Sequence, residues 1–502
     1  MKYLPDLGNG QYQNPVLLCD YSDPDVIRVG DTYYLTASSF NYVPGLPILT
    51  SADMVNWTLV NYALPNIPEE RYRTPRHAQG VWAPSIRYND GYFYICYGMP
   101  DEGIFMVRTQ DPLGEWEKPV CLLEAKGLID PCPLWDDDGR AYVVHGYARS
   151  RSGIKSILGM FPMSWDGLHA TGEDHFIYNG LATQPTIEGP KIYKRDGWYY
   201  IFAPAGGVEV GWQTVLRSRS ISGPYEEKIV LRQEDTEING PHQGGWVTAP
   251  DGSDWFMHFQ SRGLYGRIVH LQPMTWGEDG WPVMGDNGKP FLVHEKPNQR
   301  VSVPTGEKTS DDFAGPLGLQ WQFMGTWRKA FYDVGEGRLV LHACRVPEPD
   351  GTLWRCPQVI SQKVAALDFT AQVTLDTADL HPGDRAGMAL VGGQYGGLAV
   401  VRGEQGATLC SILSCGNGKG EECVEIAPLS GTAAELRMVL TRTAYAEAEA
   451  QFAYRDGGDW VPVGKPFAPA RHTWVGARVA LFSVPGGDAD GGSAAFGPFT
   501  VD

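Results

Sequence analysis

The chain has 502 residues, too many for one ordinary domain, so two domains are expected. A formal charge of −18 and a pI near 5.1 argue against nucleic acid or an anionic membrane as a partner. No run approaches a transmembrane length, and the opening MKYLPD lacks the apolar core of a signal peptide, so a cytoplasmic location is expected.

One short pattern recurs five times in residues 21–290. Each copy has an apolar strand, a tight turn and an aromatic strand, a strong hairpin signal because Asp and Gly accept positive φ. The five turns are Gly30-Asp31, Asp90-Gly91, Asp138-Gly139, Asp196-Gly197 and Asp251-Gly252. Copies about 48–59 residues apart, with about four strands each, predict a five-bladed β-propeller at residues 1–292.

The first strand of each copy carries the candidate functional residues. Counting eight residues back from the turn Asp reaches Asp23, Trp82, Asp130, Glu188 and Gln243, the last beside His242. Because the first strands of a propeller line its axis, we expect these side chains to converge at one mouth. Three carboxylates in register indicate an active site. The alternative is that each acid caps a turn or binds a nearby backbone amide.

The composition changes after Leu292. Residues 293–310 are polar and contain proline, which predicts a linker. Short alternating strands in residues 311–502 predict a second all-β domain, a concanavalin-like β-sandwich that carries no catalytic constellation. Its loop at 467–474 is the candidate for a contact with the active site. The alternative is a solvated hairpin with Trp474 packed in the sandwich core.

The nine cysteines are scattered along the chain. Cys410, Cys415 and Cys423 form the one local group, and no histidine lies near them, so a zinc site is not expected. Free thiols fit the expected cytoplasmic location.

Hydrolysis of a glycosidic bond suits a ring of acids. It needs one protonated carboxyl to protonate the leaving oxygen and one carboxylate to activate water or to attack directly. A third carboxylate raises the pKa of the acid or orients it. Aromatic side chains would stack on sugar faces, and the candidates are Phe40, Trp82 and Trp212. Arg267 would donate to vicinal hydroxyls, its alternative role being a structural ion pair.

Four motifs carry a resemblance to a known family. They are SDPDVI at 22–27, GVWAPS at 80–85, IDP at 129–131 and IEGPK at 187–191. In this order they resemble the catalytic domain of glycoside hydrolase family 43. The linker and sandwich resemble the C-terminal domain of its β-xylosidase and α-L-arabinofuranosidase branch.

The resemblance implies a five-bladed propeller that inverts the anomeric centre. It implies Asp23 as general base, Glu188 as general acid and Asp130 as pKa modulator and orienting residue. It also places Phe40, Trp82 and Arg267 in the −1 subsite. The expected separation of the base and acid carboxyls is about 6.5–9.5 Å, which leaves room for water.

One further position matches the family and one stretch departs from it. His242 resembles the axial histidine of the family, which lies near a water cluster or a calcium ion; its alternative is an ordinary hydrogen-bonded residue. No cofactor is required, and a structural calcium on the propeller axis, held by His242 through water, is left open. The stretch 208–213 departs from the Asn-His or Asp-His stretch of better-known β-xylosidases.

The expected function is an exo-acting inverting hydrolase that releases terminal xylose from short β-1,4-xylo-oligosaccharides and also takes α-L-arabinofuranosyl groups. The alternatives are an enzyme with α-L-arabinofuranosidase as its main activity, a phosphorylase on a similar propeller, and a non-catalytic carbohydrate-binding propeller. The expected partner is the oligosaccharide, with a homo-oligomer left open.

Overall fold

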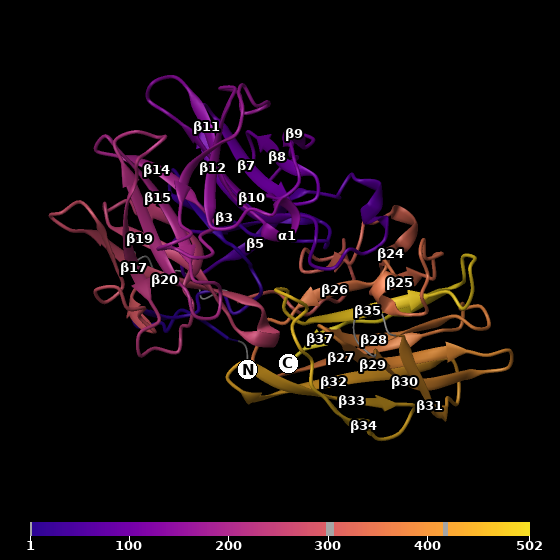
Figure 1. Ribbon diagram of the computed structural model, residues 1–502. Coiled ribbons are helices and arrows are strands. Elements are labelled where there is room, and N and C mark those ends of the chain that lie inside the picture. The colour runs from indigo at the N-terminus through magenta and orange to yellow at the C-terminus, as the bar shows by residue number, and fades with distance from the viewer. Residues whose placement is uncertain (1–2, 298–305, 415–419) are drawn as a thin grey trace.

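The computed structural model describes residues 3–297, 306–414 and 420–502 and confirms the all-β prediction. Figure 1 shows a propeller, coloured indigo to magenta, beside a sandwich in orange and yellow. Cys415 and residues 298–305 of the expected linker lie outside the described residues. The eight cysteines within them are all free thiols.

The propeller consists of five four-stranded antiparallel sheets, each built from consecutive strands. Blade one is β2 (Asp25–Val29), β3 (Thr32–Thr36), β4 (Gly45–Ser51) and β5 (Thr58–Leu64); blade two is β6 (Trp82–Asn89), β7 (Tyr92–Met99), β8 (Gly103–Thr109) and β9 (Val120–Glu124); blade three is β10 (Leu128–Trp135), β11 (Ala141–Tyr147), β12 (Ile157–Met163) and β13 (His175–Asn179); blade four is β14 (Lys191–Arg195), β15 (Trp198–Ala205), β16 (Trp212–Ser218) and β17 (Glu226–Arg232); blade five is β18 (His242–Thr248), β19 (Asp254–Ser261), β20 (Arg267–Trp276) and β21 (Pro282–Met284).

The Asp-Gly turns join the first two strands of the blades, as predicted. At Asp90-Gly91 the φ angles are 46° and 82°, and at Asp196-Gly197 they are 49° and 72°. Both residues of these two turns are therefore in the left-handed region, which matches the right-handed twist of the flanking strands.

Each pair of neighbouring blades shares an apolar core. Separate clusters join blades two and three, three and four, four and five, and five and one. The cluster between blades one and two continues into the sandwich, where Ile48 and Ile95 belong to the same core as Leu481. The sandwich therefore packs on the propeller through a common core.

No blade combines strands from the two ends of the propeller domain, so the ring is closed by other contacts. The lead-in strand β1 (Gln11–Gln13) pairs with β22 (Val293–Glu295), and Leu17 forms a bridge with Val269 of blade five. The segment expected to be a linker thus begins as a strand, because the lead-in offers it a hydrogen-bonding edge.

The C-terminal domain consists of two antiparallel sheets, as expected for a sandwich. The seven-stranded sheet has the order β23 (Gln322–Phe323), β26 (Ile360–Lys363), β35 (Arg478–Val484), β28 (Arg385–Val391), β29 (Tyr395–Arg402), β30 (Ala407–Ser414) and β31 (Glu421–Pro428). The eight-stranded sheet has the order β24 (Tyr332–Gly335), β25 (Arg338–His342), β36 (Ser493–Phe496), β27 (Phe369–Asp376), β32 (Ala433–Ala444), β33 (Glu447–Arg455) and β34 (Val461–Phe467), with β37 (Thr500–Val501) beside β27.

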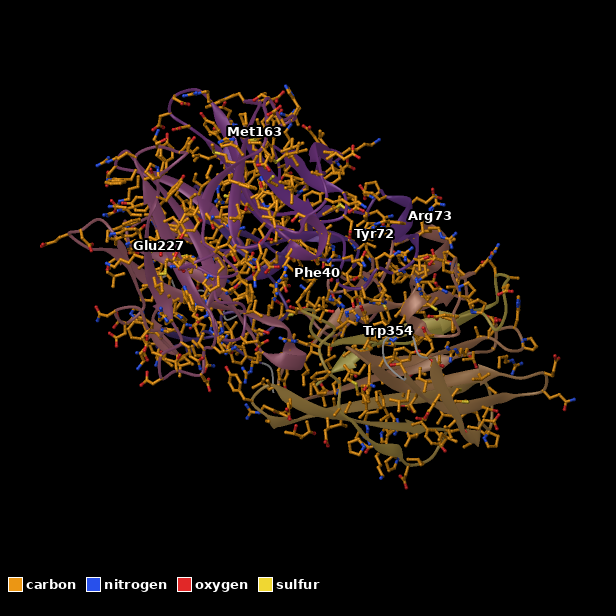
Figure 2. The ribbon with its side chains drawn as sticks, in the orientation of Figure 1. Phe40, Tyr72, Arg73, Met163, Glu227 and Trp354 are labelled. Atoms are coloured by element: carbon orange, nitrogen blue, oxygen red, sulfur yellow. The ribbon has the colours of Figure 1, made fainter. Side chains whose placement is uncertain are left out.

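Helical segments in the described residues are short and lie between strands. They are η1 (Glu70–Arg73), α1 (Arg149–Ser152), η2 (Gly263–Tyr265), η3 (Lys329–Phe331) and η4 (Leu353–Arg355). Figure 2 places Phe40 on the side of the propeller that faces the sandwich, and Phe40 shares a buried cluster with Trp354 of η4. This side of the propeller also carries the candidate site.

Candidate active site

A positive φ angle occurs within two residues of the start of the first strand in every blade. The residues are Asp23 (53°), Ala83 (30°), Asp130 (57°), Gly189 (56°) and Gln243 (32°). In blades two, three and five the strand register shifts at this point, which marks a β-bulge. A bulge redirects side chains, so the strained residue and its neighbour turn toward the propeller axis.

The three predicted acids line one cavity of about 220 Å³. Its wall is made by Asp23, Phe40, Trp82, Ala83, Ile129, Asp130, Glu188, Val208, Gln243, Arg267 and Trp474. This volume lies below the range of about 300–1,000 Å³ that is typical of ligand pockets. The cavity therefore suits one small sugar unit.

Asp23 is held by charged and polar donors on both oxygens. The Arg267 guanidinium donates from Nη1 to Oδ1 at 2.6 Å, and Ser38 donates from Oγ to Oδ2 at 2.6 Å. Ser38 also accepts from the Ala83 amide at 2.7 Å, so its hydroxyl proton is directed at Asp23. A carboxylate, which only accepts, fits these surroundings.

Glu188 is the most exposed of the three acids. Its side chain is 31% exposed, against 4% for Asp23, so it lies at the mouth of the cavity. His242 lies below it, with Nε2 3.1 Å from Oε1. Burial opposes ionisation of Glu188, but the hydrogen bond and charge of His242, with the charge of Arg267, hold its pKa below the usual value.

Asp130 is buried and accepts from the Gly189 amide at 2.8 Å. Burial, with the negative charges of Glu188 and Asp23, raises the pKa of Asp130 to about 8. Because Asp130 and Glu188 interact strongly, this pKa belongs to the pair. The two carboxyls together keep one proton up to about pH 8, while Asp23 is stabilised separately by Arg267.

Three of the five residues predicted to bind substrate lie in the cavity wall: Phe40, Trp82 and Arg267. Trp212 does not. Its indole nitrogen donates to Gln184 at 2.8 Å, and its ring packs against Arg232, so these neighbours hold it outside the wall.

His242 also lies outside the wall, fully buried beneath Glu188. Its Nδ1 and the Oε1 of Gln243 are buried without a hydrogen-bond partner. Among the described residues, no three His, Cys, Asp or Glu side chains are grouped so that they could hold a metal ion directly. The surroundings of His242 thus offer two unpaired polar atoms and no set of direct ligands.

The sandwich contributes Trp474 to the cavity wall. Its ring lies 5.0 Å from that of Trp82 at 82°, an edge-to-face contact. The loop predicted to approach the site therefore reaches it. Trp474 is only partly buried and packs against a cluster that joins sandwich residues to Phe40 of the propeller, so it is not enclosed in the sandwich core. At the rim, Arg471 of the same loop forms an ion pair with Glu209 at 2.7 Å.

Sequence reasoning left four wall residues without a role: Ala83, Ile129, Val208 and Gln243. Ala83 and Ile129 adjoin predicted residues, and Gln243 was one of the five register positions. The role of Gln243 could have been predicted from its side-chain amide at a register position, because that amide donates to Asp130 across 3.4 Å. Val208 begins the stretch 208–213 that departs from better-known β-xylosidases.

Two carboxyls with different surroundings in one small cavity, Asp23 bound by arginine and Glu188 more exposed, match the pair of acids on which glycoside hydrolases depend. Residues 12–282 match the family described as "Glycosyl hydrolases family 43". Residues 310–502 match the "Beta xylosidase C-terminal Concanavalin A-like domain". The chain belongs to glycoside hydrolase family 43 and is an enzyme that acts on oligosaccharides.

Relatives support this assignment along nearly the whole chain. A beta-xylosidase of Formosa agariphila is 33% identical over 95% of this chain and 88% of its own length. The non-reducing end alpha-L-arabinofuranosidase BoGH43B of Bacteroides ovatus is 30% identical over 76% of this chain and 74% of its own. The crystal structure of a xylan beta-1,4-xylosidase from Bacillus halodurans C-125 superposes with a TM-score of 0.85 at 25% identity, covering 98% of this chain and 99% of that one.

Proposed function

We propose that the enzyme is an exo-acting, inverting β-xylosidase that releases terminal xylose from short β-1,4-xylo-oligosaccharides. The observation that carries the proposal is the arrangement of the three acids in one small cavity, with Asp23 bound by Arg267 and Glu188 the most exposed of the three. A cavity of this size, partly walled by Trp474 of the sandwich, favours a single terminal sugar over the middle of a polymer.

In this proposal Asp23 is the general base. Its carboxylate takes a proton from water as that water attacks the anomeric carbon, and Arg267 and Ser38 keep it in place. Glu188 is the general acid. Its position at the mouth suits transfer of the proton held by the Asp130–Glu188 pair to the leaving oxygen. Asp130 keeps that proton available at neutral pH.

The wall supplies the contacts for the sugar. Phe40 and Trp82 offer apolar faces, and Trp474 adds a third aromatic ring from the sandwich. A pentopyranose and a pentofuranose present similar hydroxyls to such a wall. The relation to the arabinofuranosidase of B. ovatus supports α-L-arabinofuranosyl groups as the second substrate.

Paired hydrolysis of 4-nitrophenyl β-D-xylopyranoside and 4-nitrophenyl α-L-arabinofuranoside tests the substrate. We expect turnover of both, with the xyloside preferred. Proton NMR of xylobiose hydrolysis tests the stereochemistry, and the first xylose released should be the α-anomer. A β-anomer as the first product would overturn the inverting assignment, and inactivity on all three substrates would overturn the proposed function.

The proposal needs no cofactor, because the carboxyls perform both proton transfers. If calcium binds on the axis, His242 Nδ1 and Gln243 Oε1 are the unpaired atoms that would face its water shell. Its charge would then hold His242 in place beneath Glu188. Calorimetric titration of chelator-treated enzyme with calcium measures this binding independently of activity.

We also propose that the enzyme works in the cytoplasm on imported oligosaccharides, without nucleic acid or a membrane as partner. The free thiols and the charge of −18 support this proposal. Separately, no helix within the described ranges is both long and apolar enough to cross a membrane. Cell fractionation checks the location. A homo-oligomer also remains a prediction, which analytical ultracentrifugation would test.

A further inference from the structure

Asp20 lies just before blade one, where the first blade, the fifth blade and the sandwich meet. Its carboxylate is buried. Oδ1 accepts from the backbone amide of Arg267 at 2.8 Å and from Ser22 Oγ at 3.1 Å. Oδ2 accepts from the backbone amide of Gly476 in the sandwich at 2.8 Å. One carboxylate therefore joins three parts of the molecule that are far apart in sequence.

Two glycines allow this close approach. A Cβ on Gly476 would lie 2.8 Å from the backbone nitrogen of Gly266, and a Cβ on Gly266 would lie 2.4 Å from Cγ of Asp20. Beside them, the Ala477 amide donates to the Leu264 carbonyl at 2.6 Å. The sandwich chain is thus seated against the turn that leads directly into Arg267.

The groups bound by Asp20 lead to two residues of the cavity wall, Arg267 and Trp474. Arg267 donates to Asp23, the proposed general base, at 2.6 Å. Gly476 follows Trp474 by two residues, after a turn closed by reciprocal backbone hydrogen bonds between His472 and Val475 at 2.9 Å. A change at Asp20 is therefore transmitted along short, hydrogen-bonded stretches to the base side and to the aromatic wall.

We propose that Asp20 is a positioning residue for the hydrolysis, and that its carboxylate sets the spacing between Arg267 and the Trp474 loop. Through it the sandwich fixes part of the sugar pocket from outside the propeller. This inference rests on the proposed function. A carboxylate that only stabilised the fold would leave the kinetic constants of the folded enzyme unchanged.

The first test is Asp20→Asn, which keeps the size of the side chain but replaces one acceptor with a donor. That donor would face the amide of Arg267 or of Gly476. We expect kcat/KM on 4-nitrophenyl β-D-xyloside to fall about 10- to 100-fold, since small misplacements in an active site have effects of this size. The same change is then made in Trp474→Ala. In the wild-type background Asp20→Asn should raise KM and lower kcat. In the Trp474→Ala background we expect it to lower kcat in the same way but to leave KM unchanged.

The second test reaches the same contact from the sandwich and does not depend on Asp20→Asn folding. In Gly476→Ala the new methyl group meets the Gly266 backbone and displaces the loop. Gly458→Ala is the matched control, because nothing lies within 4 Å of its Cβ position. We expect Gly476→Ala to raise KM and Gly458→Ala to match the wild type.

Two results would overturn the inference. One is an equal fold-change in KM when Asp20→Asn is made in the wild type and in Trp474→Ala. The other is a folded Gly476→Ala enzyme with the wild-type KM. Wild-type enzyme without activity on either aryl glycoside would instead refute the proposed function, so the two failures are distinguishable.

Discussion

Asp23 at the start of blade one and Asp130 at the start of blade three are both followed by proline, and their φ angles are 53° and 57°. Their neighbours differ. Asp23 faces Arg267 from blade five, whereas Asp130 faces Glu188 from blade four. The repeat determines where each carboxyl lies. The adjacent blade gives Asp23 a cationic partner and gives Asp130 a second carboxyl, whose charge adds to burial in raising the pKa of Asp130. The following predictions test this difference, from the largest effect to the smallest.

Replacing the arginine-bound carboxylate should have the largest effect on turnover. Asp23→Asn removes the base, and we expect kcat to fall about 10²- to 10⁴-fold on the xyloside and on xylobiose alike, because both need an activated water. Steady-state kinetics measures this. Asp251→Asn, at an exposed hairpin turn of blade five, is the control. A smaller loss than for Asp130→Asn would contradict the assignment of the base.

Glu188→Gln should separate good leaving groups from poor ones. We expect a loss of about 10²-fold or more on xylobiose, whose leaving oxygen needs a proton, and a much smaller loss on 2,4-dinitrophenyl β-D-xyloside. The pH profile on the activated substrate should also lose its alkaline limb, since the donor is gone. Equal losses on both substrates would remove the support for Glu188 as the acid.

Asp130→Asn should stabilise the fold at high pH while impairing catalysis. The pKa of Asp130 rises from 3.8 to about 8 in the folded chain, so its stability contribution is full below about pH 4 and is lost as the pH rises through about 8. Asparagine does not ionise. The variant should therefore gain stability relative to the wild type between pH 5 and pH 9, by about 1.4 kcal/mol for each pH unit up to about pH 8.

Scanning calorimetry at both pH values measures this difference. A constant offset between the two proteins would show that Asp130 does not carry the proton. The alkaline limb of kcat/KM should also move to lower pH in the variant, because Glu188 no longer has a negative neighbour.

Trp474→Ala should have the smallest effect, confined to sugar binding. Removing one aromatic contact of about 0.5–1.5 kcal/mol predicts an increase in KM of about 2- to 10-fold with kcat nearly unchanged. Trp460→Ala is the control, since that ring packs on Arg437 and Arg455 elsewhere in the sandwich. An unchanged KM in Trp474→Ala would show that the sandwich only covers the propeller.

The sequence predicted the blades because the turn Asp and Gly recur with the strands. It predicted the three acids because the motifs stand at fixed distances from those turns. The structural register differs by one position in blades two and four, where Ala83 and Gly189 have the positive φ and Trp82 and Glu188 precede them. A bulge accompanies the offset in blade two, whereas the first two strands of blade four pair without a register shift, so a spacing count detects neither case.

Contacts between distant segments were the hardest to predict. Trp212 has the residue type of a sugar platform, yet Gln184 and Arg232 hold it outside the wall. Trp474 comes from another domain, and its only signal in the sequence was the aromatic and charged composition of the loop at 467–474. The proton of the Asp130–Glu188 pair depends on burial and on charges from several blades, which the order of residues does not reveal.

The way the ring closes also affects how the enzyme would lose activity. Blades one and five are not consecutive in the chain, so no short connection joins them, and their junction depends on side-chain packing, the β1–β22 pair and the Leu17–Val269 bridge. The bond between Asp23 and Arg267 crosses this same junction. Partial opening of the ring there would separate the base from its arginine while the other blades stayed intact. On warming, inactivation would then precede loss of β-structure. The sandwich is bound to both sides of the junction through Asp20, so it would delay the opening of the ring.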